Sequence, residues 1–248
     1  MAVLRVCTLN LHGKQENDDI RFSRIADLLS ELEPDLCALQ EVVVDGERTT
    51  AGGRLAELLE ERTGEEYYPY FVETHLFYEK YPEGVAVLSR HPFRSTWAAD
   101  LNDIPIPPLL PRKAAIVEVD VEGNSLIFAS VHLDHHENPL VRKFQAEKLL
   151  EALDKLSPKD AAVLLAGDFN DTEDSPPVVG LLQERGFVDA YRVINDDPGF
   201  TFPAEGPKMR IDYVFVKDLE VLSVKRILMD KGLSDHFGGV YLEFEVKR

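Results

Sequence analysis

The sequence predicts an α/β fold in which mixed β-sheets are combined with helices. Short apolar strands alternate with amphipathic helices along most of the 248 residues, and the turn Glu122-Gly123-Asn124 signals a hairpin among the crossover connections. The run 161–166 is wholly apolar, which indicates a strand buried on both faces. Because this many strands require more than one sheet, we expect a layered sandwich.

The boundaries of the expected elements follow from apolar periodicity and from the residues that end each run. A helix over 18–33 places its apolar residues at helical spacing and stops before Pro34-Asp35. The Pro-rich segment 103–111 is expected to be a loop. Further helices are expected at 54–63, 140–156 and 177–185, and strands at 3–9, 36–40, 67–73, 84–89, 114–121, 125–133, 161–166, 213–216, 221–227 and 240–246.

Composition narrows the class of protein. No internal repeat, low-complexity tract or linker divides the chain, so residues 1–248 are expected to form a single domain. Cys7 and Cys37 lie in apolar runs and are expected to be buried free thiols. The start of the chain does not resemble a signal peptide and no apolar stretch is long enough to span a bilayer, so we expect a cytoplasmic protein without membrane insertion. Nothing indicates an obligate protein partner.

The charge argues against broad, nonspecific binding of nucleic acid. Lys and Arg number 27 and Asp and Glu number 45, for a net charge of −18. An acidic surface repels polyanions. A local basic strip, or a metal ion bound at an acidic site, would reverse the potential where a phosphate binds.

Several predicted strands end in a polar side chain. Ligand sites in α/β sheets form beyond strand ends, where loops converge. A cluster of carboxylates needs a cation to remain charged, and oxygen ligands without thiolates favour Mg²⁺, with Mn²⁺ or Ca²⁺ as alternatives. Each residue alone is more often structural, as a loop cap, a surface ion pair or a turn residue; the joint pattern indicates a site. The residues are Asn10, Glu41, His132, Asp168, Asn170, Asp212, Asp235 and His236.

Seven short motifs, taken in order, resemble those of the endonuclease/exonuclease/phosphatase superfamily, the group with a deoxyribonuclease-I-like fold. A single such motif is weakly specific, whereas the ordered set covers nearly the whole chain. The resemblance implies a four-layer α-β-β-α sandwich, with two mixed β-sheets packed face to face and helices outside. It also implies hydrolysis of a phosphodiester or phosphomonoester. The motifs are Thr8-Leu9-Asn10, Gln40-Glu41, Glu83-Gly84, Val131-His132-Leu133, Gly167-Asp168-Phe169-Asn170, Arg210-Ile211-Asp212-Tyr213 and Ser234-Asp235-His236.

The resemblance also implies which residues bind metal and activate water. Glu41 resembles the principal metal-binding carboxylate, with Asn10 and Asp235 near or on the metal. Asp168 and Asn170 resemble the pair that orients and activates the attacking water. A divalent metal would neutralise phosphate charge and stabilise the leaving oxygen.

Two histidines are implied at the phosphate. Asp212 and His236 resemble a carboxylate–imidazole pair, and a carboxylate on one ring nitrogen suits a histidine to act as a charged clamp or acid. His132 resembles the second histidine, and Glu83 stands where its carboxylate partner would be. Arg112 occupies a position where some members place a phosphate-binding arginine.

The substrate is less well defined, and three classes of function stay open. The leading one is a metal-dependent phosphohydrolase acting on a small or single-stranded phosphoester; the others are a DNA repair or degradation nuclease and a non-catalytic binding protein. No segment is dense in Lys and Arg, which favours the first. His135 and His136 either contact substrate or face solvent, and Phe202 either lines the cleft or packs on the core.

Overall fold

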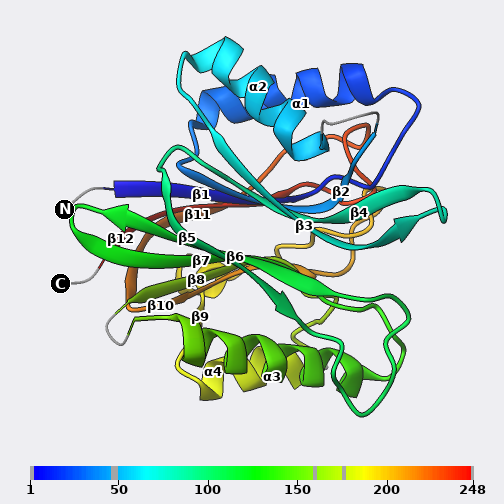
Figure 1. Cartoon of the computed structure of the whole chain (residues 1–248), viewed down its shortest axis with the longest axis vertical. Helices are drawn as coiled ribbons and strands as arrows, with labels where there is room; N and C mark the ends of the chain where they lie inside the picture. Colours follow the sequence, from blue (N-terminus) through cyan, green and yellow to red (C-terminus); the bar gives the residue numbers. More distant parts are fainter. Residues whose placement is uncertain (1–2, 46–49, 159–160, 175–176, 247–248) are drawn as a thin grey trace.

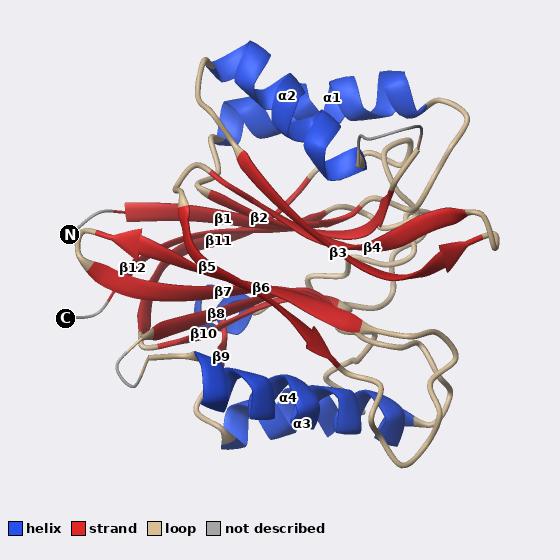
Figure 2. Cartoon of the chain, in the orientation of Figure 1, coloured by secondary structure: helices blue, strands red, loops and turns tan. Residues whose placement is uncertain are grey.

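Two six-stranded β-sheets pack face to face, and helices cover the outer surface of each (Figure 1 and Figure 2). The computed structural model describes residues 3–45, 50–158, 161–174 and 177–246. This arrangement is the four-layer α-β-β-α sandwich that the sequence predicts, with both sheets mixed in strand direction.

The first sheet has the strand order β11-β12-β1-β2-β4-β3 and is covered by α1 and α2 (Figure 1). Its strands β1 and β2 are parallel, with Asn10 beside Gln40, so both strands end at the same edge of the sheet. The elements are β1 (Val3–Asn10), α1 (Asp18–Leu32), β2 (Leu36–Val43), α2 (Ala51–Thr63), β3 (Tyr68–Phe77), β4 (Tyr81–Ser89), β11 (Leu219–Ile227) and β12 (Gly239–Val246).

The second sheet has the strand order β5-β6-β7-β8-β10-β9 and is covered by α3 and α4 (Figure 1). Strands β7 and β8 are parallel, with His132 beside Asp168. The elements are β5 (Phe93–Asp100), β6 (Lys113–Val121), β7 (Asn124–His132), α3 (Pro139–Leu156), β8 (Ala162–Asp168), α4 (Pro177–Glu184), β9 (Val188–Asp189), α5 (Ala190–Ile194) and β10 (Asp212–Lys217).

The core has three apolar layers, one between the sheets and one beneath each pair of helices. All seven residues of β8 are buried, as its apolar sequence predicts. Cys7 and Cys37 are neighbours on β1 and β2, and both are buried free thiols, as predicted. Near the strand ends, Gln40 Nε2 donates to Ser130 Oγ at 3.2 Å, which ties one sheet to the other beneath the polar residues.

The structure differs from the sequence-based boundaries at a few elements. Strand β5 was not expected, because Ser, Thr and Ala give it little apolar signal; it is half-buried and pairs along one side with β6. Helix α2 begins at Ala51 rather than Arg54, because Thr50 Oγ1 caps it by accepting from Gly53 N at 2.8 Å. The short elements β9 and α5 carry too few residues for a periodic pattern.

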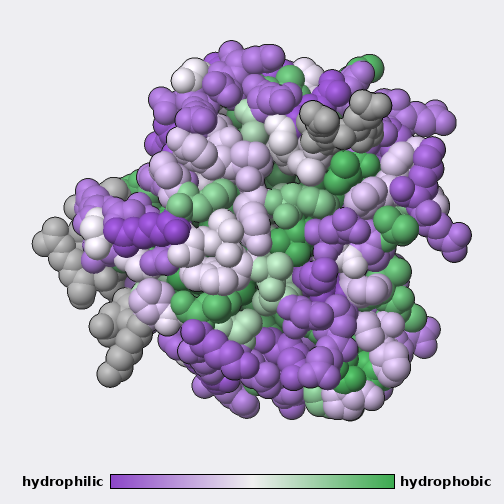
Figure 3. Space-filling view, in the orientation of Figure 1, coloured by the Kyte–Doolittle hydropathy of each residue, from purple (hydrophilic) through white to green (hydrophobic). Residues whose placement is uncertain are grey.

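The face of the molecule seen in Figure 3 is mainly hydrophilic. Figure 3 shows hydrophilic side chains over both helical layers and hydrophobic ones in the middle band, where the sheets meet. Among the helices that the structure describes, none has the length and apolar character to cross a membrane.

Candidate active site

The polar strand ends of both sheets meet at one cavity of about 450 Å³. Eight of the ten residues singled out in the sequence line it: Glu41, Glu83, Arg112, His132, Asp168, Asn170, Asp235 and His236. The other two lie directly behind this lining. Asn10 donates through Nδ2 to Glu41 Oε1 at 3.1 Å and to Asp168 Oδ2 at 3.3 Å, and Asp212 contacts His236. The structure therefore brings all ten residues together.

Unusual backbone geometry shapes two of the strand ends. Glu41 and Asn170 both adopt positive φ, +51° and +49°, where non-glycine residues are uncommon. At Gly167 a Cβ would lie 1.9 Å from the carbonyl oxygen of Val131, so only glycine allows β8 to approach β7 this closely. The glycine that precedes Asp168 is thus required by the packing of these two strands.

Asp168 lies at the centre of the polar cluster. Its Oδ1 accepts from the backbone N–H of Asn170 at 2.9 Å, and its Oδ2 lies 3.4 Å from His236 Nε2 and 3.6 Å from His132 Nε2. Burial raises the pKa of the Asp168 carboxyl, with His236 opposing and Asp212 reinforcing the rise. A carboxylate with a raised pKa, surrounded by donors, is suited to accept a proton near neutral pH.

His236 is held as a cation by its neighbours. Its Nδ1 lies 2.7 Å from Asp212 Oδ2, and its backbone N–H donates to Ser234 Oγ at 3.1 Å. Burial alone would lower the pKa of His236, but the charge and hydrogen bond of Asp212, together with Asp168 and Asp235, raise that pKa to about 10. The imidazole is therefore charged at neutral pH.

His132 has the opposite protonation state. Arg112 Nη1 lies 3.1 Å from His132 Nδ1, and because a guanidinium only donates, Nδ1 accepts and the proton is on Nε2. Burial and the charges of Arg112 and His236 hold the pKa of His132 well below its usual range. The site thus offers one neutral and one charged imidazole, each directing Nε2 toward Asp168.

The expected pairing of Glu83 with His132 is not the one that the structure shows. Glu83 Oε1 lies 3.2 Å from Nε2 of His75, a residue of β3 that the sequence analysis did not single out. The ring nitrogens of His132 contact Arg112 and Asp168 instead. His75 carries no motif, and only the pairing of β3 with β4 reveals that it faces Glu83.

Among the residues for which the sequence left alternatives, His135 and Phe202 line the cavity, and His135 is also exposed. His135 lines the cavity, whereas His136 accepts from the backbone N–H of Asn138 through Nδ1 at 2.9 Å. Phe202 forms part of the cavity wall, and its ring centroid lies 5.1 Å from the ring centroid of His236. Phe77 and Leu110, not predicted from the sequence, add further apolar surface.

Two groups of side chains could hold a divalent cation. Donor atoms of Asp168, Asp212 and His236 lie within 4.8 Å of one another. The second group is the predicted one, Asn10, Glu41 and Asp235, in which burial raises the pKa of Glu41 and the charges of Glu83 and Asp235 raise it further. Carboxylates that repel one another in a buried cluster fit a cation. Because a histidine binds a metal only as the neutral imidazole and His236 is charged, the second group fits better.

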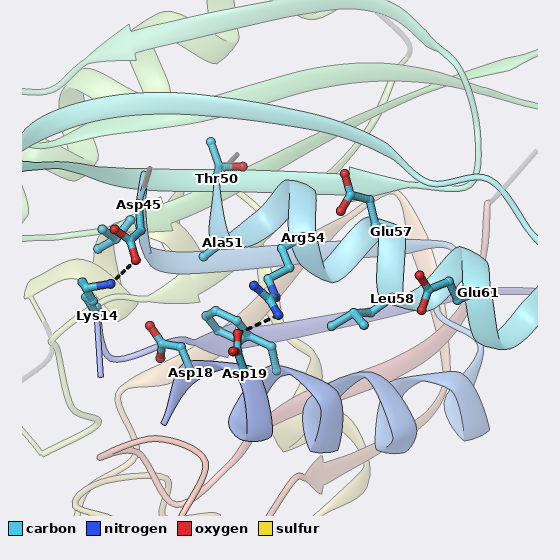
Figure 4. A pocket seen from close by; sticks show the side chains of 13 residues that line it. Lys14, Asp18, Asp19, Asp45, Thr50, Ala51, Arg54, Glu57, Leu58 and Glu61 are labelled. Atoms are coloured by element: carbon cyan, nitrogen blue, oxygen red, sulfur yellow. Dashed lines mark hydrogen bonds and ion pairs between the residues drawn. The ribbon is translucent and has the colours of Figure 1, made fainter. Parts of the chain in front are cut away.

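A separate cleft of about 490 Å³ lies between α1 and α2 (Figure 4). Its cationic groups are already paired, Lys14 with Asp45, and Arg54 with Asp19 at 2.6 Å. Among the residues that the structure describes, five carboxylates line the cleft against these two cations, which disfavours a phosphate there. The cleft lacks the combination of imidazoles, carboxylates and arginine found at the strand ends.

Comparisons with known proteins give a consistent result. The sequence profile described as "Endonuclease/Exonuclease/phosphatase family" matches residues 7–236. No curated protein sequence matches the chain.

Three solved structures illustrate the structural similarity. A family protein from Leptotrichia buccalis C-1013-b is 23% identical, with a TM-score of 0.81 over 98% of this chain and 99% of that one. A mannosyl-6-phosphatase of Bacteroides thetaiotaomicron VPI-5482 is 20% identical, with a TM-score of 0.72 over 98% and 99%. D. rerio TDP2 complexed with single strand DNA product is 19% identical, with a TM-score of 0.74 over 99% and 100%.

Proposed function

Because the chain belongs to the endonuclease/exonuclease/phosphatase family, we propose that it is a Mg²⁺-dependent phosphoesterase that hydrolyses a phosphodiester or phosphomonoester by in-line attack of water. The observation that carries the proposal is the convergence of Asp168, the charged His236 and the neutral His132 on one cavity. A proton acceptor beside a fixed cation is the arrangement that phosphoryl transfer to water needs.

Each side chain has a distinct part in this proposal. Asp168 takes a proton from the attacking water, and Asn170, fixed by donating through Nδ2 to the Leu133 carbonyl at 2.9 Å, orients that water. His236, held by Asp212, balances the charge that develops on the phosphate oxygens. His132 donates through Nε2, and Arg112 adds positive charge on the same side of the cavity.

Glu41, Asn10 and Asp235 would hold the metal ion. When bound there, Mg²⁺ supplies Lewis-acid stabilisation of the phosphate and of the leaving oxygen, and Mn²⁺ or Ca²⁺ fits the same oxygen ligands. Asn10 keeps Glu41 close to Asp168 by donating to both. Because both sheets supply these residues, we further propose that residues 1–248 act as one domain.

The substrate we propose is small or single-stranded. The net charge of −18 disfavours tracking along a duplex, and the cavity has the size of a small-molecule site. A DNA nuclease is the second candidate, which the similarity to TDP2 with a single strand DNA product favours. The third, a binding protein without activity, is disfavoured because every predicted site residue is present at the cavity.

The test is an activity panel with Mg²⁺, Mn²⁺ or Ca²⁺, and with EDTA as the control. Bis-p-nitrophenyl phosphate, single-stranded and double-stranded oligonucleotides and sugar phosphates would be the substrates. We expect Mg²⁺-dependent hydrolysis of the small and single-stranded substrates. Hydrolysis of duplex DNA with a steep dependence on salt would favour the nuclease, and absence of any hydrolysis would favour the binding protein.

A further inference from the structure

Glu83 is a buried carboxylate at the cavity wall that lacks a full set of hydrogen-bond donors. Its side chain is only 6% exposed, and among the described residues Oε2 has no hydrogen-bond partner. A Cβ at Gly13 would lie 3.4 Å from this Oε2, so the atom faces the β1–α1 loop. Oε1 lies next to His75, and both residues line the cavity. A buried carboxylate is costly unless donors satisfy it.

The hydrogen bonds of Thr74 fix where His75 carries its proton. Thr74 Oγ1 donates its single proton to the backbone carbonyl of Glu83 at 3.0 Å. His75 Nδ1, 2.9 Å from the same Oγ1, must therefore be the donor in that contact. Nε2 then faces Glu83 Oε1 at 3.2 Å. A carboxyl oxygen that meets one nitrogen of His75 still has a lone pair with which to accept a further hydrogen bond.

A β-bulge aims His75 at the cavity. On β3, Glu73 pairs with Gly84 and His75 pairs with Glu83, so Thr74 is an extra residue in the ladder. Such bulges redirect side chains beside functional sites. His75 and Glu83 both line the cavity that also contains Asp168 and His236.

We propose that Glu83, positioned by His75, accepts a hydrogen bond from a hydroxyl group on the organic part of the substrate. The substrate class is then a phosphoester of a polyhydroxy compound such as a sugar or cyclitol, an inference that rests on the proposed phosphoesterase function. A cavity of about 450 Å³ accommodates a ring of this size beside the phosphate.

Two observations favour a hydroxyl over a cation as the partner of Glu83. Among the described residues, Glu83 belongs neither to the group formed by Asp168, Asp212 and His236 nor to the group of Asn10, Glu41 and Asp235 that we propose for the metal. His75 Nε2 already lies 3.2 Å from Oε1, so a partner that needs only a single hydrogen bond suits Glu83. A neutral donor that forms one good hydrogen bond is the better match.

The experiment compares substrates that differ only in their hydroxyl groups. Glucose 6-phosphate is paired with cyclohexylmethyl phosphate, and the p-nitrophenyl diesters of the same two alcohols form a second pair. The readout is the ratio of kcat/KM for the hydroxylated over the hydroxyl-free member. Since one hydrogen bond to such an acceptor contributes about tenfold to a hundredfold, we expect a wild-type ratio of at least about tenfold.

Variants of Glu83 separate its hydrogen bond from its charge. Glu83→Met should bring the ratio close to one. Glu83→Gln should keep most of the wild-type ratio, because the amide can still form a hydrogen bond with a hydroxyl group, which both donates and accepts. Glu73→Met, at an exposed Glu of the same strand, is the matched control and should leave the ratio unchanged. A thermal melt checks that Glu83→Met folds. If this variant does not fold, the kcat/KM ratios of the wild type and of Glu83→Gln test the proposal.

Several results would overturn the proposal while leaving the phosphoesterase function intact. The first is a wild-type kcat/KM ratio near one, and the second is a Glu83→Met variant that keeps the wild-type ratio. The third is an equal decrease of the ratio in Glu83→Met and Glu83→Gln, because this result would assign a role to the charge of Glu83 alone. Cleavage of bis-p-nitrophenyl phosphate with neither pair hydrolysed would also count against it. Failure to cleave any phosphoester would overturn both the function and this inference.

Discussion

His236 and Asp212 form a buried hydrogen bond of 2.7 Å between Nδ1 and Oδ2. Asp212 starts β10 and lies directly opposite Asp168 in the antiparallel ladder, so the same backbone pairing positions both carboxylates around one imidazole. The bond fixes the orientation of the ring and leaves Nε2 directed at Asp168, 3.4 Å away. The charge on His236 therefore depends on Asp212.

This relationship predicts a shift in the pH profile of Asp212→Asn. The pKa of His236 is raised from 6.5 to about 10, so the ring of the folded protein keeps its charge until the pH approaches about 10. The stability that this charge contributes is fully present below pH 6.5 and is lost as the pH rises through about 10. An amide at position 212 removes the main raising interaction, so the alkaline limb of kcat/KM should move down in pH. Titration of the His236 ring by NMR measures the same change, and an unshifted ring pKa would contradict it.

Removing the imidazole tests its part in turnover. We expect His236→Ala to lower kcat by about 10²–10⁴-fold, the usual value of a group that stabilises charge or moves a proton in the transition state. The melting temperature should show that the fold persists. His91→Ala, at a half-buried histidine near the β4–β5 turn, is the control and should keep wild-type turnover. A His236→Ala enzyme with nearly wild-type kcat would refute the role.

The metal site can be located by calorimetry. Glu41→Ala removes a carboxylate of the group formed with Asn10 and Asp235, so Mg²⁺ affinity should fall clearly. Asp212→Asn should affect Mg²⁺ affinity less, since Asp212 is already bonded to a charged imidazole. The reverse order of effects would place the cation at Asp168, Asp212 and His236 instead.

A pair of glycine substitutions tests the close approach of β7 and β8. In Gly167→Ala the new Cβ would meet the Val131 carbonyl at 1.9 Å, at a residue with φ of +154°, so we expect a loss of more than about 2 kcal/mol in the free energy of unfolding. Gly180→Ala, in α4 with no atom within 4 Å of the new Cβ, should stabilise by about 0.5–1 kcal/mol. Urea denaturation of both variants provides the measurement. Equal stabilities would contradict the packing argument.

Much of the fold and of the cavity could be predicted from the sequence, because the signals are local. Apolar runs such as β8 end abruptly in Asp168, and the edge of a parallel pair brings two strand ends together. The strand-end pattern therefore predicts eight of the site residues, and the family resemblance adds Glu83 and Arg112; the described cavity contains or adjoins all of them.

What the sequence could not give depends on strand register. The pairing of His75 with Glu83 results from a β-bulge at Thr74, and a bulge leaves no periodic signature. The family resemblance implies Glu83 as the partner of His132, but Nδ1 of His132 is taken by Arg112. Strand β5 was missed because half-buried edge positions accept Ser, Thr and Ala.

The most direct measurement is the Mg²⁺-dependent hydrolysis of bis-p-nitrophenyl phosphate by wild-type protein and by Asp168→Asn. The amide keeps the shape of the side chain but accepts no proton from water, so the rate should fall by about 10²-fold or more. Asp103→Asn, at a carboxylate whose side chain is 98% exposed, should match the wild type. Equal rates for wild type and Asp168→Asn would contradict the assignment of Asp168 as the group that activates water.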